Sequence, residues 1–104
     1  MALRCIAQAA LAAITETTLV DGSQVQPIHL RSLTFCERGG AAVTFRLRLA
    51  LGAAAVDNKQ YLYYNLPIVP NDSFTLSLDI GMLPGDQLIA YASTANLSIN
   101  LFAE

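Results

Sequence analysis

The segment that decides the fold class reads Val43-Thr-Phe-Arg-Leu-Arg-Leu-Ala-Leu51. Every second residue in it is apolar, which is the period of a β-strand, whose successive side chains point to opposite faces of a sheet. A helix would spread the same apolar residues around its circumference. We therefore predict a half-buried strand over residues 43–51. Its predicted core-facing residues are Val43, Phe45, Leu47, Leu49 and Leu51.

The same alternation appears in three other segments, residues 61–68, 74–80 and 97–101, which we also predict to be strands. Proline has no backbone N–H to donate within a sheet, so Pro67 places the first of these segments at a sheet edge or at a strand end. Turn-forming Gly, Pro, Asn, Asp and Ser residues separate the segments at regular intervals.

Ile28–Cys36 is a further predicted strand, in which the apolar positions change phase around Ser32. An extra residue in one strand of a pair has this effect, so we expect a β-bulge there. The double glycine Gly39-Gly40 then separates this strand from residues 43–51. Because glycine favours tight hairpin turns, we predict that these two strands pair with each other.

The first 20 residues are ambiguous, because alanine tolerates a helix whereas Thr and Val favour a strand. The opening resembles a weak signal peptide, but Gln8 interrupts its apolar stretch, so we expect an uncleaved first strand over residues 3–9 followed by irregular chain. Taken together, these segments predict an all-β fold. We expect residues 1–104 to form one domain, an antiparallel β-sandwich of about seven or eight strands, jelly-roll-like or Ig-like.

The composition predicts assembly. Apolar residues make up 54% of the chain and charged residues only 13%, against about 25% charged residues in an average soluble domain. A free monomer normally keeps a charged surface without large apolar patches, so a chain this apolar is expected to cover part of its surface with other subunits.

The charge pattern argues against nucleic acid as a partner, since a net charge of −2 provides no basic field for phosphate. Arg31, Arg38, Arg46 and Arg48 lie close together in the sequence, and we interpret them as the solvated faces of two strands. No apolar run reaches the ~18 residues of a membrane-spanning helix, so no membrane partner is predicted.

The two cysteines, Cys5 and Cys36, match neither a C-x-x-C motif nor a zinc-binding spacing. Their separation does not decide between free thiols and a disulfide. We favour buried free thiols that act as small apolar side chains, with a disulfide as the alternative.

No catalytic, cofactor-binding or metal-binding residues are predicted. His29 is the only histidine, the alternation places it on the polar face of its strand, and the sequence contains no Gly-x-Ser-x-Gly motif. Asp72, Asp79 and Asp86 recur every seven residues, but the first and last occupy turns and the middle one lies within a strand. We expect three separate sites. Neither a G-x-G-x-x-G motif nor a P-loop is present, so no nucleotide cofactor is indicated.

The tyrosines are the best candidates for a contact surface, because a tyrosine combines a flat apolar ring with a polar tip. Within residues 61–68 the alternation points Tyr64 toward the core and leaves Tyr61 and Tyr63 on the opposite face. Tyr61 and Tyr63 are therefore the predicted interface residues. Packing between the two sheets is the alternative role for this group.

Several motifs are specific in their residues, and not only in the alternation of apolar and polar positions. In chain order they are Phe35-Cys-Glu-Arg-Gly-Gly40, Tyr61-Leu-Tyr-Tyr-Asn-Leu-Pro-Ile68, Asn71-Asp-Ser-Phe74, Leu83-Pro-Gly-Asp86 and Ile89-Ala-Tyr-Ala-Ser-Thr-Ala-Asn-Leu-Ser98. In the order and the residues of these motifs the chain resembles, over nearly its whole length, a group of small virion structural proteins of tailed bacteriophages. One departure is Val20-Asp-Gly-Ser23, where members of that group commonly carry a Pro-Ala-Gly turn.

The resemblance implies a non-enzymatic β-sandwich that is built into a virion in many copies. The expected partners are other copies of the chain and other virion proteins of the neck, tail, baseplate or fibre-attachment region. A capsid decoration protein on the head lattice is the nearest alternative. A carbohydrate- or receptor-binding module, in which tyrosines stack on sugar rings, is the second.

Overall fold

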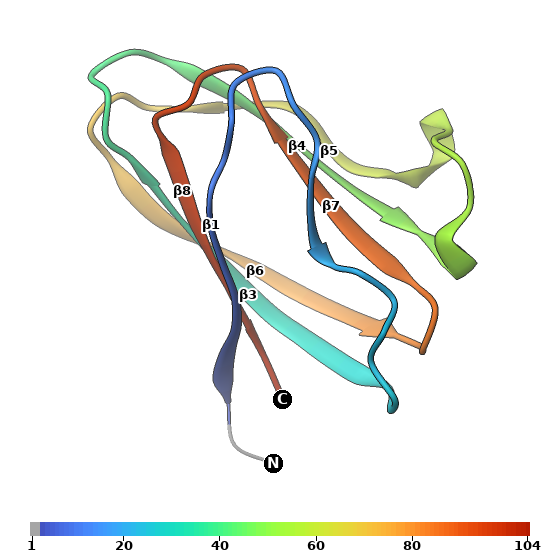
Figure 1. The fold of residues 1–104 in the computed structure, drawn as a ribbon. Helices are drawn as coiled ribbons and strands as arrows, with labels where there is room; N and C mark the ends of the chain where they lie inside the picture. Colours follow the sequence, from blue (N-terminus) through green and yellow to red (C-terminus); the bar gives the residue numbers. More distant parts are fainter. Residues whose placement is uncertain (1–2) are drawn as a thin grey trace.

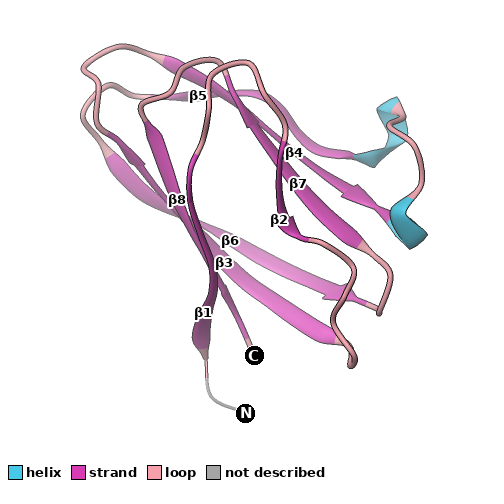
Figure 2. Cartoon of the chain, viewed as in Figure 1, coloured by secondary structure: helices cyan, strands magenta, loops and turns pink. Residues whose placement is uncertain are grey.

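The computed structural model describes residues 3–104, which form eight β-strands and two short 3-10 helices (Figure 1, Figure 2). The strands are β1 (Arg4–Ala10), β2 (Thr17–Val20), β3 (Ile28–Glu37), β4 (Val43–Ala50), β5 (Tyr61–Ile68), β6 (Ser73–Met82), β7 (Gln87–Ala92) and β8 (Leu97–Ala103). Helices η1 (Leu51–Ala53) and η2 (Asn58–Gln60) lie in the loop between β4 and β5. The predicted all-β fold is confirmed.

The strands form two antiparallel sheets, in the orders β1-β8-β3-β6 and β2-β7-β4-β5, packed face to face (Figure 1). The pairs β1:β8, β2:β7, β3:β6 and β4:β5 are nested, so the first half of the chain runs as one long ribbon against the second half. Rolling such a ribbon into two sheets produces the eight-stranded jelly roll. The predicted sandwich is confirmed, and its strand order is the jelly-roll alternative.

The predicted hairpin between residues 28–36 and 43–51 is wrong, because β3 and β4 belong to different sheets. Their apolar faces meet across the core instead, where the rings of Phe35 and Phe45 pack edge to face with centroids 4.5 Å apart. The double glycine therefore lies where the ribbon crosses from one sheet to the other. Burying both apolar faces against each other outweighs the local preference of the glycines for a hairpin.

The two strands of the ribbon cross between the sheets together. At the crossing from β3 to β4, the Glu37 carboxylate accepts hydrogen bonds from the backbone N–H groups of Gly39, Gly40 and Asn71, all within 3.1 Å. Asn71 lies in the other crossing, between β5 and β6. Glu37 is buried, and it ties the two crossings to each other.

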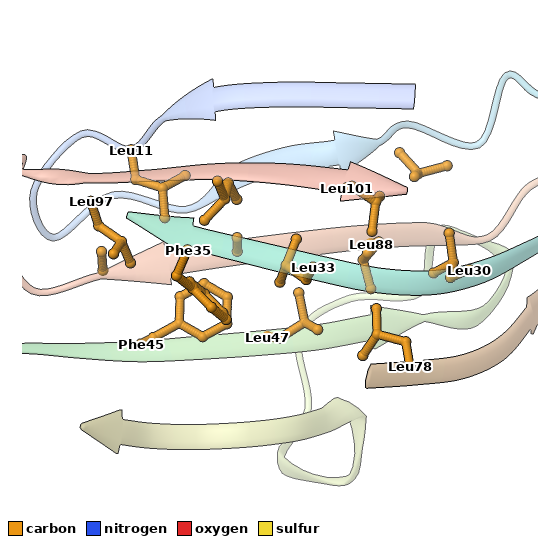
Figure 3. Close-up of a cluster of buried hydrophobic side chains, with 14 of the residues drawn as sticks. Leu11, Leu30, Leu33, Phe35, Phe45, Leu47, Leu78, Leu88, Leu97 and Leu101 are labelled. Carbon is orange, nitrogen blue, oxygen red and sulfur yellow. The ribbon is translucent and has the colours of Figure 1, made fainter. Parts of the chain in front are cut away.

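The core fills the space between the sheets (Figure 3). Leu30, Leu33, Phe45 and Leu47 are completely buried in it, as the alternation predicts. The prediction for Leu51 is wrong, since that residue begins η1 and is exposed. The β4 alternation stops where the chain leaves the sheet.

The strand predicted over residues 3–9 is β1, and the bulge near Ser32 appears as a register shift between Leu30 and Ser32. Two strands were missed. The segment predicted to be irregular after residue 9 contains β2, which is only four residues long. Three consecutive residues in β7, Leu88 to Ala90, are buried, so this central strand shows no period of two.

Candidate functional site

The β5 strand carries two bulges that decide which of its tyrosines face outward. In its register with β4, Leu66 lies opposite Phe45, Tyr63 opposite Leu47 and Tyr61 opposite Arg48. One residue separates Phe45 from Leu47, whereas two separate Leu66 from Tyr63, and the extra residue is Asn65. Leu47 and Arg48 are adjacent, whereas Leu62 lies as an extra residue between Tyr63 and Tyr61. Asn65 adopts a left-handed conformation with φ of 55°, which asparagine tolerates better than most residues.

These bulges overturn the predicted facing of the tyrosines. Tyr64, predicted to be in the core, has 58% of its surface exposed. Tyr63, predicted to share an outer face with Tyr61, turns inward and packs against the core. Tyr61 remains outside, and its ring meets the Tyr64 ring edge to face with centroids 4.9 Å apart. The outward pair is therefore Tyr61 and Tyr64.

Arg46 joins this pair to a third tyrosine. Its guanidinium carbon lies 4.2 Å from the Tyr64 ring centroid and 4.7 Å from that of Tyr91, the residue directly opposite on β7. Its Nε atom donates to Oδ1 of Asn65 at 2.8 Å. A cation over an aromatic face contributes about 0.5–1 kcal/mol at an exposed site. We call Arg46, Tyr61, Tyr64 and Tyr91 the tyrosine–arginine surface.

An ion pair between the buried Arg48 and the exposed Glu16 supports one end of this surface. Arg48, predicted to be solvated, is only 7% exposed, because its guanidinium group donates to both carboxylate oxygens of Glu16 at 2.7 and 2.8 Å and to Gln60 at 2.8 Å. The hydrogen bonds between Arg48 and Glu16 lower the pKa of the Glu16 carboxyl and raise that of the Arg48 guanidinium. Gln60 immediately precedes Tyr61, so this network fixes the start of β5.

A shallow depression of about 360 Å³ lies beside the surface, lined by Asn58, Tyr61 and Tyr64. It offers two aromatic rings and one amide group to solvent. A depression of this composition can accept a flat apolar group, such as a side-chain ring or the face of a sugar, and hydrogen-bond to its edge.

The other predicted positions take no part in this surface. His29 contacts the carboxylate of Asp79 on β6, while Asp72 accepts from the backbone of Ser73 at 2.8 Å. Asp86 is buried and accepts from the backbone N–H groups of Gly52 and Leu83. Each aspartate therefore has partners of its own.

Cys5 and Cys36 are free, but the prediction that they are buried is wrong, because both are exposed. In β3 the inward position beside Cys36 is taken by Phe35, so the alternation turns the thiol outward. Within residues 3–104, His, Cys, Asp and Glu side chains do not form a group of three that could hold a metal ion.

In the described part of the chain, no helix has the length and apolar character needed to cross a membrane. Comparison with known proteins leaves the chain without a match, both among protein-family models and among curated proteins.

Sequence reasoning found Tyr61 and grouped Tyr91 with the other tyrosines as a possible contact platform, but it assigned Tyr64 to the core and missed Arg46. One signal was available: Asn65 is an asparagine in the middle of an alternating strand, where that residue is unfavourable unless the chain bulges. The pairing of Tyr91 with Arg46 had no such signal, because it depends on which strands are neighbours.

Proposed function

We propose that this chain is a non-enzymatic structural component of a tailed-phage virion. It assembles in many copies, through contacts with itself and with neighbouring virion proteins of the neck, tail, baseplate or fibre-attachment region. The resemblance of its motifs to small virion proteins supports this proposal. The jelly-roll order supports it by analogy, since viral capsid domains use this fold, although lectins use it as well.

The observation that carries the proposal is the tyrosine–arginine surface. Tyrosine and arginine are, with tryptophan, enriched at the energetic centres of protein interfaces: tyrosine buries a large ring with few rotatable bonds, and arginine adds a planar group with several hydrogen-bond donors. Here Arg46 is already positioned between Tyr64 and Tyr91 before any partner binds. A preorganised surface loses less entropy on association.

Further apolar side chains are exposed outside this surface. Those with more than half of their surface exposed are Leu3, Ile14, Val25, Leu51, Val56, Val69 and Leu83. They lie mainly in loops, at both ends of the sandwich. A protein packed among many neighbours can place such residues in contacts, where they leave water.

Light scattering of the purified protein across a concentration series tests the proposal. We expect a stable multiple of 11.1 kDa. Tyr64→Asp should weaken assembly or partner binding, because it replaces the ring beside Arg46 with a charge that must be desolvated. The matched control is Ala10→Asp, which places the same charge at an exposed position on β1. Equal behaviour of the two variants would contradict the role of the tyrosine–arginine surface.

A chain that remains monomeric at all concentrations would favour the role of a capsid decoration protein, which binds only the finished head lattice.

The depression lined by Asn58, Tyr61 and Tyr64 favours a different candidate function, a carbohydrate- or receptor-binding module. Glycan binding that is lost in Tyr61→Ala and Tyr64→Ala, but retained in Ala10→Asp, would support this second function.

A further inference from the structure

The four edge strands of the sandwich are β1, β2, β5 and β6. An exposed edge presents unpaired backbone N–H and C=O groups, and proteins usually block it with bulges, prolines, charges or short length. Three of these edges are blocked. The β1 register shifts between Cys5 and Ala7, β2 has four residues and a shift of its own, and β5 combines two bulges with Pro67.

The β6 edge lacks most of these devices. It is ten residues long, contains neither proline, lysine nor arginine, and its single charge, Asp79, is engaged by His29. Its register with β3 shifts once, where Leu78 and Asp79 of β6 lie opposite Arg31 alone, but its inward and outward residues alternate without a break from Phe74 to Met82. Such an edge is a ready template for another strand.

The inner face of β6 is also incompletely covered. Phe74, Leu76 and Ile80 pack against the core but remain partly exposed, whereas Leu33 and Phe35, their neighbours on β3, are completely buried. An added strand would cover the open side of these three residues. The edge therefore offers apolar area as well as hydrogen bonds.

We infer that β6 pairs antiparallel with β6 of a second copy across a two-fold axis, which joins two four-stranded sheets into one continuous sheet. This inference deepens the proposed function and depends on it. A two-fold contact requires a surface that is complementary to itself. Because apolar residues occupy even positions and polar residues odd positions, paired residue numbers must have an even sum to match the faces.

The register centred on Ser77 meets this condition with nearly full overlap. It places Ser77 opposite Ser77 of the second copy, Leu76 opposite Leu78, Phe74 opposite Ile80, and Thr75 opposite Asp79. The next even register, centred on Leu78, brings the two Asp79 carboxylates closer together. Since like charges on neighbouring cross-strand positions are destabilising, the Ser77 register is favoured.

Cysteine crosslinking tests this register in the full chain. In a Cys5→Ser, Cys36→Ser background, Ser77→Cys should form a disulfide-linked dimer of twice 11.1 kDa under mild oxidation. Residues directly opposite in an antiparallel pair have Cα atoms about 4.5–5.5 Å apart, within the range for a disulfide. Ser73→Cys is the control, because the two copies of residue 73 would be roughly 27 Å apart in this register. Equal crosslinking of both variants, or none at Ser77→Cys, would overturn the inference.

A second variant tests the edge without a crosslink. Ser77→Lys places lysines opposite each other across the two-fold axis, and residue 77 is exposed, so the fold should survive. We expect the dissociation constant of the dimer to rise about tenfold or more. Gln8→Lys, at an exposed position on the opposite edge strand β1, is the matched control and should associate normally.

The outcomes separate this inference from the proposed function. If the native chain assembles and Ser77→Lys assembles equally well, the pairing of β6 is overturned while virion assembly remains supported. If the native chain is monomeric and β6 instead binds an extended segment of another protein, self-pairing is overturned as well. Loss of assembly in Ser77→Lys alone, together with the Ser77→Cys crosslink, supports the inference.

Discussion

The strands β5 and β6 follow each other in the chain, and both alternate apolar and polar residues in the sequence. In the structure only β6 keeps this alternation throughout. Bulges at Leu62 and Asn65 interrupt β5, so its residues change faces twice within eight positions. The comparison teaches that an alternating sequence predicts a strand reliably, whereas the face of each residue is decided in the structure, because inserted residues in β5 reverse it.

The two strands also differ in what they offer a partner. The bulges in β5 turn Tyr64 outward beside Arg46 and at the same time block that edge against a further strand. The regularity of β6 hides its apolar residues in the core but leaves the edge open. One strand therefore presents side chains, and the other presents backbone.

The largest expected effect is a loss of folding stability, tested by making the same Leu→Asp substitution once on each strand. Leu78→Asp on β6, at a position 8% exposed, should destabilise the fold by several kcal/mol, because it buries a charge without a partner. Leu62→Asp on β5, at a bulge position 41% exposed, should cost less than about 1 kcal/mol. Urea denaturation followed by circular dichroism measures both. Equal losses of stability would contradict the assignment of Leu62 to a bulge.

A smaller effect is expected at the Asn65 bulge. Asn65→Val should lower the free energy of unfolding by about 1–2 kcal/mol, because a β-branched residue is strained at φ of 55°. Asn65→Gly removes the same bond to Arg46 but fits the conformation, so its stability should lie closer to that of the native chain. On β6, Thr75→Val occupies a regular strand position and should change stability little. The same denaturation assay orders the three variants.

The smallest effect is a pH dependence at the crossing between β5 and β6. The hydrogen bond from the backbone of Asn71, followed by those from Gly39 and Gly40, lowers the pKa of the Glu37 carboxyl. A lowered pKa in the folded state contributes stability above pH 4.5, the ordinary pKa of glutamate, and this contribution is lost as the pH falls through the folded value.

Glu37→Gln should therefore show a smaller loss of stability than the native chain when the pH is lowered through this range. Glu16, whose pKa is also lowered, should preserve part of the pH dependence. Denaturation midpoints above and below pH 4.5 provide the measurement. An identical pH dependence in both proteins would show that Glu37 does not link the crossings through its charge.

The sequence predicted the fold class and most strands, because a period of two over five or more residues reports local backbone geometry directly. It also located the bulge near Ser32, where the apolar positions change phase. It missed β7, which is buried on both faces, and it wrongly paired β3 with β4 across Gly39-Gly40. Local turn preference is weak compared with the burial of two apolar faces against each other.

For the contact surface, the sequence by itself determined that the chain carries tyrosines in alternating segments and few charges. Only the tertiary structure decided that Tyr64 and not Tyr63 faces outward, and that Arg46 lies between Tyr64 and Tyr91. The physical reason is that side-chain facing in a sheet has a period of two. One inserted residue reverses it, and whether a residue is inserted depends on the neighbouring strand as much as on the strand itself.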